Sequence, residues 1–221
     1  MIGIFDLDGP RHPPAGGGAP DALVILLHGY GADGMDLISL APHWGQAAPG
    51  AQFVSPHAPY PCEMGFGRQW FGVQGMDGDG YLAGVRAAAS ILDAFIDAEL
   101  AAAGLGEDRL ALVGFSQGTM MALHVAPRRS APVAGVVGFS GRLVGEALLA
   151  EEATSKPPFL LVHGDADEVV PHAALAEATR GLEAAGIPVE AHTRPGLGHG
   201  IDQEGLTLGA RFLAGALGGV K

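Results

Sequence analysis

Residues 109–126 read R-L-A-L-V-G-F-S-Q-G-T-M-M-A-L-H-V-A, and this stretch decides the fold. Its apolar run, residues 110–113, is short and ends in a β-branched residue, which is typical of a buried strand. Residues 117–126 contain good helix formers and stop at Pro127, which predicts a helix. Between them stands G-F-S-Q-G, a G-x-S-x-G pattern centred on Ser116. Its glycines leave room for a tight strand-to-helix turn that would hold Ser116 exposed and strained.

A serine in such a turn can act as a nucleophile. The helix that follows it offers backbone N–H groups to a developing oxyanion. The alternative is an ordinary glycine-rich turn, because short Gly/Ser patterns recur by chance. The decision between the two depends on the chemical partners found further along the chain.

Composition restricts the class of protein. The chain has 221 residues, of which 48% are hydrophobic, enough for one domain with a sizeable core. The net charge of −12 argues against nucleic acid as a partner. Cys62 is the only cysteine, which excludes a disulfide framework and a CxxC site. The chain shows no targeting signal and no apolar run of membrane-spanning length, so we expect a cytoplasmic protein without stable membrane insertion.

The N-terminal residues 1–7 would form a short edge strand, followed by a flexible, Pro/Gly-rich stretch at 10–20. They contain F-D-L-D-G, which resembles the start of the haloacid dehalogenase phosphatase motif. Pro10 stands where that motif needs Thr or Val. We therefore interpret Asp6 and Asp8 as solvated turn residues and leave the role of this string open.

A second glycine-rich loop follows residues 22–27, an apolar run that predicts a buried strand. Gly29, Gly31 and Gly34 form G-x-G-x-x-G, the pattern of a dinucleotide-binding loop. That fold needs an acidic residue about twenty positions on, at the end of the next strand. The next predicted strand, residues 52–55, ends without a carboxylate. We therefore favour the other interpretation, in which this loop donates a backbone N–H to an oxyanion hole.

Residues 57–79 are irregular and rich in proline, glycine and aromatic side chains, including Trp70 and Phe71. The stretch is too long and too apolar for a plain linker, which indicates an excursion or hairpin that lines a binding site. The alternative is a small cluster packed on the surface. The string D-G-D-G at 77–80 lacks the remaining ligands of a calcium loop.

The rest of the chain alternates between helical and strand patterns. Helices are predicted at 35–46, 81–103, 172–185 and 202–217, and strands at 133–139, 158–162 and 188–193. Ser140 ends one of these strands, but its string lacks the closing glycine, so we interpret it as structural. The β-α-β-α order predicts a single α/β domain with a mostly parallel twisted sheet and helices on both faces.

A serine, a pair of aspartates and a histidine, side chains that can work together in catalysis, each follow the end of a predicted strand. Ser116, the pair Asp165 and Asp167, and His199 each come after the C-terminal end of a predicted strand. Ligands bind at that edge of such sheets. The chain order Ser, Asp, His is the order of the α/β-hydrolases.

Five segments carry a resemblance to a known family. They are L-L-H-G-Y-G-A-D-G, Q-W-F, G-F-S-Q-G, H-G-D-A-D-E-V-V-P and G-L-G-H-G-I, in this order between residues 26 and 201. With them the chain resembles the carboxylesterase/phospholipase family of α/β-hydrolases, which includes the acyl-protein thioesterases. The resemblance implies Asp167, not Asp165, as the acid of a catalytic triad. Tyr30 stands where the family usually has an apolar residue, and we expect it to narrow or polarise the pocket mouth.

The resemblance also implies a mechanism, ester hydrolysis through an acyl-enzyme. Ser116 would attack the carbonyl, His199 would transfer the proton, and Asp167 would fix the imidazole. The backbone N–H groups of Tyr30 and Gln117 would hold the oxyanion. No cofactor and no metal are expected, and no H-E-x-x-H pattern occurs in the chain.

The substrate pocket is expected to be lined by Trp70, Phe71, Val170 and Leu197. Residues 141–156 are too few for a helical cap and hold at most one helix. We therefore expect an open site without a large lid, which would favour small soluble esters.

The remaining histidines of interest, His28, His124 and His163, are interpreted as hydrogen-bonded structural residues. The preferred function is a serine carboxylesterase acting on a small-molecule ester. The alternatives are an acyl-protein thioesterase or lysophospholipase on the same scaffold and a non-catalytic, hydrolase-like binding protein. A homodimer is left open.

Overall fold

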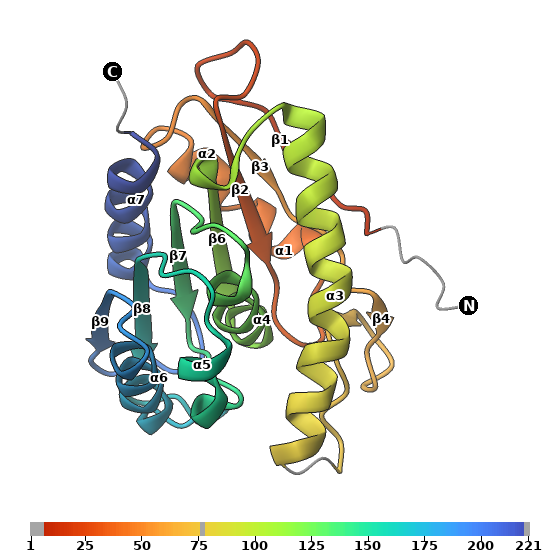
Figure 1. Cartoon of the computed structure of the whole chain (residues 1–221), viewed down its shortest axis with the longest axis vertical. Helices are drawn as coiled ribbons and strands as arrows, with labels where there is room; N and C mark the ends of the chain where they lie inside the picture. The colour runs from red at the N-terminus through yellow and green to blue at the C-terminus, as the bar shows by residue number, and fades with distance from the viewer. Residues whose placement is uncertain (1–6, 76–77, 219–221) are drawn as a thin grey trace.

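The computed structural model describes residues 7–75 and 78–218 (Figure 1). In chain order its elements are β1 (Arg11–His12), β2 (Ala22–Leu27), α1 (Gly34–Ile38), α2 (Ala41–Trp44), β3 (Ala51–Val54), β4 (Tyr60–Pro61), β5 (Arg68–Gln69), α3 (Gly78–Ala103), η1 (Glu107–Arg109), β6 (Leu110–Phe115), α4 (Gln117–Val125), η2 (Ala126–Arg128), β7 (Gly135–Phe139), α5 (Glu146–Glu152), β8 (Phe159–Gly164), α6 (Ala173–Ala184), β9 (Val189–Arg194) and α7 (Gln203–Leu217).

Seven strands form the main sheet in the order β1-β3-β2-β6-β7-β8-β9. β1 pairs antiparallel with β3, and every other pairing in this sheet is parallel. The central strands are apolar along their whole length because both faces of the sheet are covered; all six residues of β2 are buried. The predicted mostly parallel sheet is therefore confirmed.

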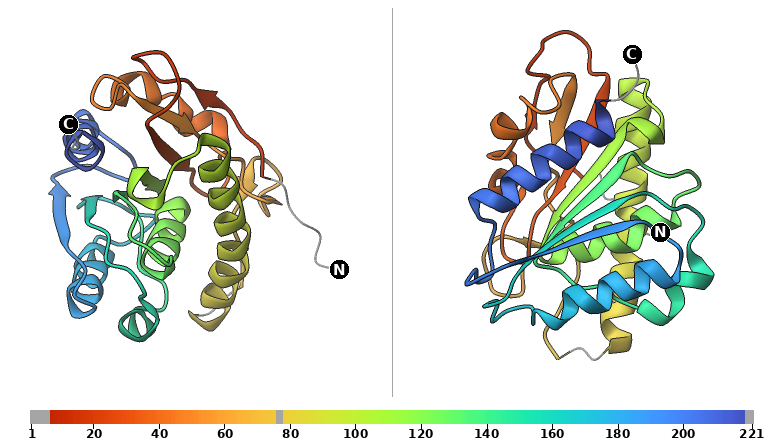
Figure 2. Two further views of the ribbon diagram at one scale, coloured as in Figure 1. Left: turned by 45° about the horizontal axis from the view of Figure 1, so that its top comes forward. Right: turned by 90° about the vertical axis from the view of Figure 1, so that its left-hand side faces the viewer.

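Helices cover both faces of the sheet (Figure 2). Ile25 and Leu112 belong to the apolar cluster on the face of α3, α4, α5 and α6. Their chain neighbours Val24 and Val113 belong to the cluster on the face of α2 and α7, as expected when side chains alternate along a strand. The connection from β7 to β8 contains only α5, which confirms the absence of a large lid. Within the described ranges, no helix is both long enough and apolar enough to cross a bilayer.

The structure differs from the predicted elements at β1 and in the helix predicted at 35–46. β1 is an edge strand inside the stretch at 10–20 that was expected to be flexible, whereas the strand predicted at 1–7 falls almost wholly outside the described residues. The single helix predicted at 35–46 is divided into α1 and α2. Pro42 explains the division, because it has no N–H to continue a helix but is accepted in the first turn of α2.

Within the irregular stretch 57–79, β4 and β5 form an antiparallel two-stranded hairpin, which confirms the predicted hairpin. It lies beside the long helix α3 (Figure 1). The segment that follows the hairpin leads through Trp70 and Phe71 to Val73, which lines the pocket described next.

Candidate active site

Ser116 occupies a strained turn between β6 and α4. Its φ is 53° and its ψ is −114°, and among the described residues only Ser140 is another non-glycine with positive φ. A Cβ at Gly114 would lie 2.5 Å from the carbonyl carbon of Gly118, and a Cβ at Gly118 would lie 1.8 Å from the carbonyl oxygen of Leu27. Only glycine therefore fits at both flanking positions, and the G-x-S-x-G pattern has a steric cause.

Gln117, the residue after Ser116, has two separate roles in this geometry. Its backbone N–H is the first of α4 and has no partner within the helix. Its buried side chain accepts a hydrogen bond from the Trp70 N–H at 2.8 Å and donates one to the Phe71 carbonyl at 2.8 Å. Gln117 thus attaches the end of the hairpin directly to the nucleophile turn.

The loop after β2 lies against the same turn. A Cβ at Gly29 would meet Ser116 Cβ at 3.3 Å, so the loop backbone packs closely on the serine. The Gly31 N–H donates to the Arg68 carbonyl of β5 at 2.9 Å, which joins the loop to the hairpin. The N–H of Tyr30 has no acceptor within the part of the chain that the structure describes. Among the described residues, the N–H groups of Tyr30 and Gln117 thus have no acceptor, and both residues line the same pocket as Ser116, as donors of an oxyanion hole would.

His28 supports this loop from within the core. Its Nδ1–H donates to the Gly29 carbonyl at 2.7 Å, and its Nε2 accepts from the Ala58 N–H at 3.0 Å. Burial lowers the pKa of His28 to about 4, so the ring is neutral at physiological pH. His28 is a hydrogen-bonded structural histidine, as the sequence indicated.

Asp167 and His199 are brought together from two different strand ends. Asp167 follows β8 and His199 follows β9, and Asp167 Oδ2 accepts a hydrogen bond from His199 Nδ1 at 2.8 Å. The other oxygen, Oδ1, accepts from the N–H groups of Val169 and Val170. Burial opposes ionisation of this carboxyl, but the hydrogen bonds from His199, Val170 and Val169 outweigh it and lower the pKa of Asp167. The His199 ring packs on Phe115, next to Ser116, with ring centroids 4.9 Å apart.

Two neighbouring side chains complete the surroundings of the acid. His163 Nε2 lies 2.9 Å from the Val170 carbonyl and 3.3 Å from Asp167 Oδ2, so its N–H is held beside the carboxylate. Burial lowers the pKa of His163. Asp165 is turned away and accepts a hydrogen bond from the Gly196 N–H at 2.6 Å.

The pocket beside Ser116 has a volume of about 180 Å³ and is mainly apolar. Its lining consists of Tyr30, Val73, Tyr81, Ser116, Gln117, Met120, Arg142, Val169, Val170 and Pro171.

Of the four residues expected to line the pocket, only Val170 does so. The expectation for Trp70 and Phe71 needs correction, because both side chains are turned into the core beneath the site, where they are 0% and 2% exposed. Leu197 is also outside the lining; its carbonyl instead accepts a hydrogen bond from the Ala166 N–H.

Several of the lining residues were not predicted from the sequence, including Tyr81, Met120 and Arg142. Met120 lies one turn into α4, on the helix that begins beside Ser116. Arg142 follows the C-terminal end of β7, a strand edge at which this class of sheet binds ligands, so the topology itself offered a signal for it.

Tyr30 polarises the pocket mouth in the way expected from its position. Its hydroxyl donates to Glu63 Oε2 at 3.1 Å. The same oxygen accepts from the backbone N–H groups of Val73 and Gln74, and these bonds lower the pKa of Glu63. The aromatic ring is thereby fixed at the side of the pocket.

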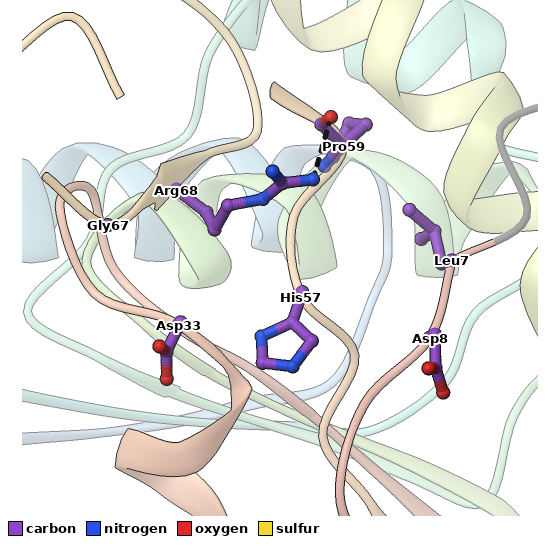
Figure 3. A pocket seen from close by; sticks show the side chains of 7 residues that line it. All are labelled: Leu7, Asp8, Asp33, His57, Pro59, Gly67 and Arg68. Atoms are coloured by element: carbon purple, nitrogen blue, oxygen red, sulfur yellow. Dashed lines mark hydrogen bonds between the residues drawn. The ribbon is translucent and has the colours of Figure 1, made fainter. Parts of the chain in front are cut away.

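A larger pocket of about 530 Å³ lies elsewhere, among Leu7, Asp8, Asp33, His57, Pro59, Gly67 and Arg68 (Figure 3). Its polar side chains form hydrogen bonds to the backbone. Arg68 donates to the carbonyls of Ala58 and Pro59, and His57 Nδ1 accepts from the Gly34 N–H. Ser116 is absent from its lining, so the smaller pocket is the candidate active site despite its size.

Two further expectations concern residues outside this site. Ser140, interpreted as structural, is 1% exposed, and its Oγ has no hydrogen-bond partner in the described chain. His124 is 3% exposed, but its Nδ1 also lacks a partner there, so the expectation of a hydrogen-bonded histidine is wrong at this atom. Burial lowers the pKa of His124 to about 4.

Comparison with known proteins agrees with this geometry. The family model described as phospholipase/carboxylesterase matches residues 15–216. Esterase YpfH of Escherichia coli (strain K12) is 32% identical over 187 residues, covering 83% of this chain and 78% of that protein. Acyl-protein thioesterase 1 of Neurospora crassa is 30% identical over 211 residues, covering 87% of this chain and 85% of that protein.

Among solved structures, the crystal structure of esterase PE8 superposes with a TM-score of 0.91 at 43% identity, covering 96% of this chain and 99% of that chain. The fold, the matched length and these relatives agree. The chain therefore belongs to the phospholipase/carboxylesterase family, and it is a serine hydrolase with the α/β-hydrolase fold.

Proposed function

We propose that this protein is a serine carboxylesterase that hydrolyses small carboxylic esters through an acyl-enzyme formed on Ser116. The observation that carries the proposal is the pairing of Asp167 Oδ2 with His199 Nδ1 at 2.8 Å, beside a strained serine. A carboxylate on Nδ1 fixes the imidazole tautomer and leaves Nε2 without a proton, ready to accept one.

In the first half of the reaction, Ser116 Oγ attacks the ester carbonyl while His199 Nε2 takes the hydroxyl proton. The Asp167 carboxylate stabilises the imidazolium that forms. The tetrahedral oxyanion receives hydrogen bonds from the backbone N–H groups of Tyr30 and Gln117. Donors of this kind contribute about 3–4 kcal/mol each to transition-state stabilisation in comparable enzymes.

In the second half, His199 returns the proton to the leaving alcohol, and the acyl group stays on Ser116. A water molecule then attacks the acyl-enzyme with His199 again as the base, which releases the acid and restores the serine. The pocket volume of about 180 Å³ limits the groups that can be enclosed. Ordinary ligand pockets begin at roughly 300 Å³, so short groups are favoured.

A thioesterase or a lysophospholipase on the same scaffold is the second candidate. The thioesterase among the relatives supports it, and the acyl-enzyme chemistry would be the same. The small pocket argues against enclosure of a long acyl chain. Rates on p-nitrophenyl esters of increasing chain length, compared with thioesters of the same acids, separate the candidates.

The nucleophile is tested by a matched pair of alanine variants. Ser116→Ala should lower kcat by roughly 10⁴-fold or more with the fold intact. Ser140→Ala is the control, because Ser140 shares the positive φ but is buried away from the pocket lining. A fluorophosphonate should label Ser116 alone. Labelling of Ser140, or full activity in Ser116→Ala, would overturn the proposal.

A further inference from the structure

Arg142 is the feature of the pocket that the mechanism leaves unused. Among the described residues that line the pocket, it alone carries a full charge, and most of the others are apolar. The protein as a whole is acidic, with 24 Asp and Glu against 12 Lys and Arg. In a pocket of this kind, the few polar groups set the orientation and identity of the ligand. A cation here therefore requires a specific explanation.

The backbone leading to Arg142 is packed onto the nucleophile turn. The Ser140 N–H donates to the Val162 carbonyl at 2.9 Å, which ties this point to β8. A Cβ at Gly141 would lie 2.4 Å from Thr119 Cβ and 3.1 Å from the Ser116 carbonyl oxygen. The chain has no room to move toward the serine at Gly141, so the fold fixes the backbone position of Arg142 relative to Ser116.

Among the described residues, the guanidinium of Arg142 has no hydrogen-bond or ion-pair partner. The two arginines that precede it in the chain are both engaged: Arg128 bonds Glu152 at 2.6 Å, and Arg129 bonds Glu107 at 2.7 Å. Arg142 therefore has its hydrogen-bond donors available at the pocket. A guanidinium presents those donors in a fork that matches the two oxygens of a carboxylate.

We propose that Arg142 binds a carboxylate on the substrate, so that the preferred substrates are short esters that carry a negative charge near the scissile bond. The inference rests on the proposed esterase function and specifies its substrate class. The charge can belong to the acyl part, as in a half-ester of a dicarboxylic acid, or to the alcohol part, as in an ester of a hydroxy acid. Both present the same group to Arg142.

The test compares charged esters with neutral isosteres on the full-length protein. Monoethyl succinate and ethyl succinamate place a carboxylate or a carboxamide on the acyl side. O-Acetylglycolate and O-acetylglycolamide do the same on the alcohol side. The measured quantity is the ratio of kcat/KM for each charged ester to that of its neutral partner, from chromatography of the acid products.

For at least one pair, the wild-type ratio should be on the order of ten or higher, the gain from one charge-assisted contact. Arg142→Gln should lower that ratio about tenfold, and Arg142→Lys should restore part of it, because Lys keeps the charge but not the planar fork. Arg180→Gln is the matched control, because Arg180 is exposed on α6 and lies outside the pocket lining. This substitution removes the same charge and should leave the ratio of kcat/KM values unchanged. Because Arg142 is exposed, the wild-type ratio should also fall with ionic strength.

Two results would overturn the anion site alone: neutral esters hydrolysed well with a ratio near one for both pairs, or an unchanged ratio in Arg142→Gln. A wild-type protein that hydrolyses none of the four esters, nor p-nitrophenyl acetate, would instead overturn the esterase function, and the substrate class would fall with it.

Discussion

Asp167 and His199 are joined by a hydrogen bond of 2.8 Å between Oδ2 and Nδ1, while the carboxylate of Asp165, on the same loop, accepts a hydrogen bond from the Gly196 N–H. The two carboxylates look equivalent in the string H-G-D-A-D. The structure separates them, because the loop turns one inward and the other outward: the Asp167 side chain is fully buried and Asp165 is exposed. Only the buried carboxylate can orient the base.

Replacing each carboxylate by its amide tests this separation. Asp167→Asn should lower kcat by about 10³–10⁴-fold, because the amide favours the wrong imidazole tautomer. Asp165→Asn loses one exposed hydrogen bond and should change kcat by less than about tenfold. Steady-state kinetics of both variants on one p-nitrophenyl ester gives the answer. The reverse order of losses would assign the acid to Asp165.

The side chain of Gln117 supports a second prediction, on stability. Gln117→Met should leave the buried Trp70 N–H and Phe71 carbonyl unpaired and lower the free energy of unfolding by about 2–4 kcal/mol. Gln74→Met is a suitable control, since Gln74 is exposed and only its backbone bonds Glu63. The control should stay within about 0.5 kcal/mol of wild type in urea unfolding. Equal stability of both variants would show that the Gln117 contacts contribute nothing.

Much of the fold could be predicted from the sequence because its central strands are uniformly apolar and its helices are periodic. β2 was predicted at its observed bounds, and α4 to within one residue. The failures occur where local patterns compete with tertiary contacts. β1 consists of Arg11 and His12, and nothing apolar marks it; it forms because β3 offers it a free edge.

The triad residues could be chosen because strand ends converge on one edge of a parallel sheet. Side-chain direction could not be chosen in the same way. Trp70 and Phe71 belong to the right segment, but their two backbone hydrogen bonds with the Gln117 side chain hold them so that the rings enter the core. Arg142 was not predicted, because it stands out only through having no ion-pair partner among the described residues. A sequence does not show which arginines are paired.

The buried histidine on α4 predicts how stability depends on pH. The pKa of His124 is lowered to about 4 by burial and by the nearby Arg128. The unfolded chain, with a histidine pKa near roughly 6.5, therefore binds more protons than the folded one between about pH 4 and 6.5. The stability contributed by neutral His124 is complete above about pH 6.5 and is lost as the pH falls. The loss in unfolding free energy amounts to about 3 kcal/mol near pH 4.

His124→Leu removes this titration together with the unpartnered Nδ1. The drop in unfolding free energy between pH 7 and pH 4 should be smaller than in wild type by about 3 kcal/mol. At pH 7 the variant should be about as stable as wild type, because no hydrogen bond to Nδ1 is lost. Denaturant titrations at the two pH values measure both quantities. An identical pH dependence in the two proteins would show that His124 is not the titrating group.

The final prediction concerns behaviour at an oil–water interface. Lipases that carry a mobile lid become active when the lid opens on a lipid surface. Here the β7–β8 connection provides only α5, from Glu146 to Glu152. The other candidate segment, the β4–β5 hairpin, is attached to the nucleophile turn through Gln117 and to the loop after β2 through Arg68. The first segment is therefore too short to form a large lid, and the second is fastened to the site by hydrogen bonds.

The rate on tributyrin should therefore follow ordinary saturation below the solubility limit and show no jump when droplets appear. Short-chain p-nitrophenyl esters should be hydrolysed well and long triglycerides poorly, because the pocket of about 180 Å³ is open but small. Ser116→Ala, measured across the same concentrations, corrects for spontaneous hydrolysis and for light scattering by the emulsion. A sharp increase in the wild-type rate confined to concentrations above the solubility limit would contradict this prediction, since it would require a segment that moves at the interface, whereas α5 is too short for a large lid and the hairpin is held by the hydrogen bonds described above.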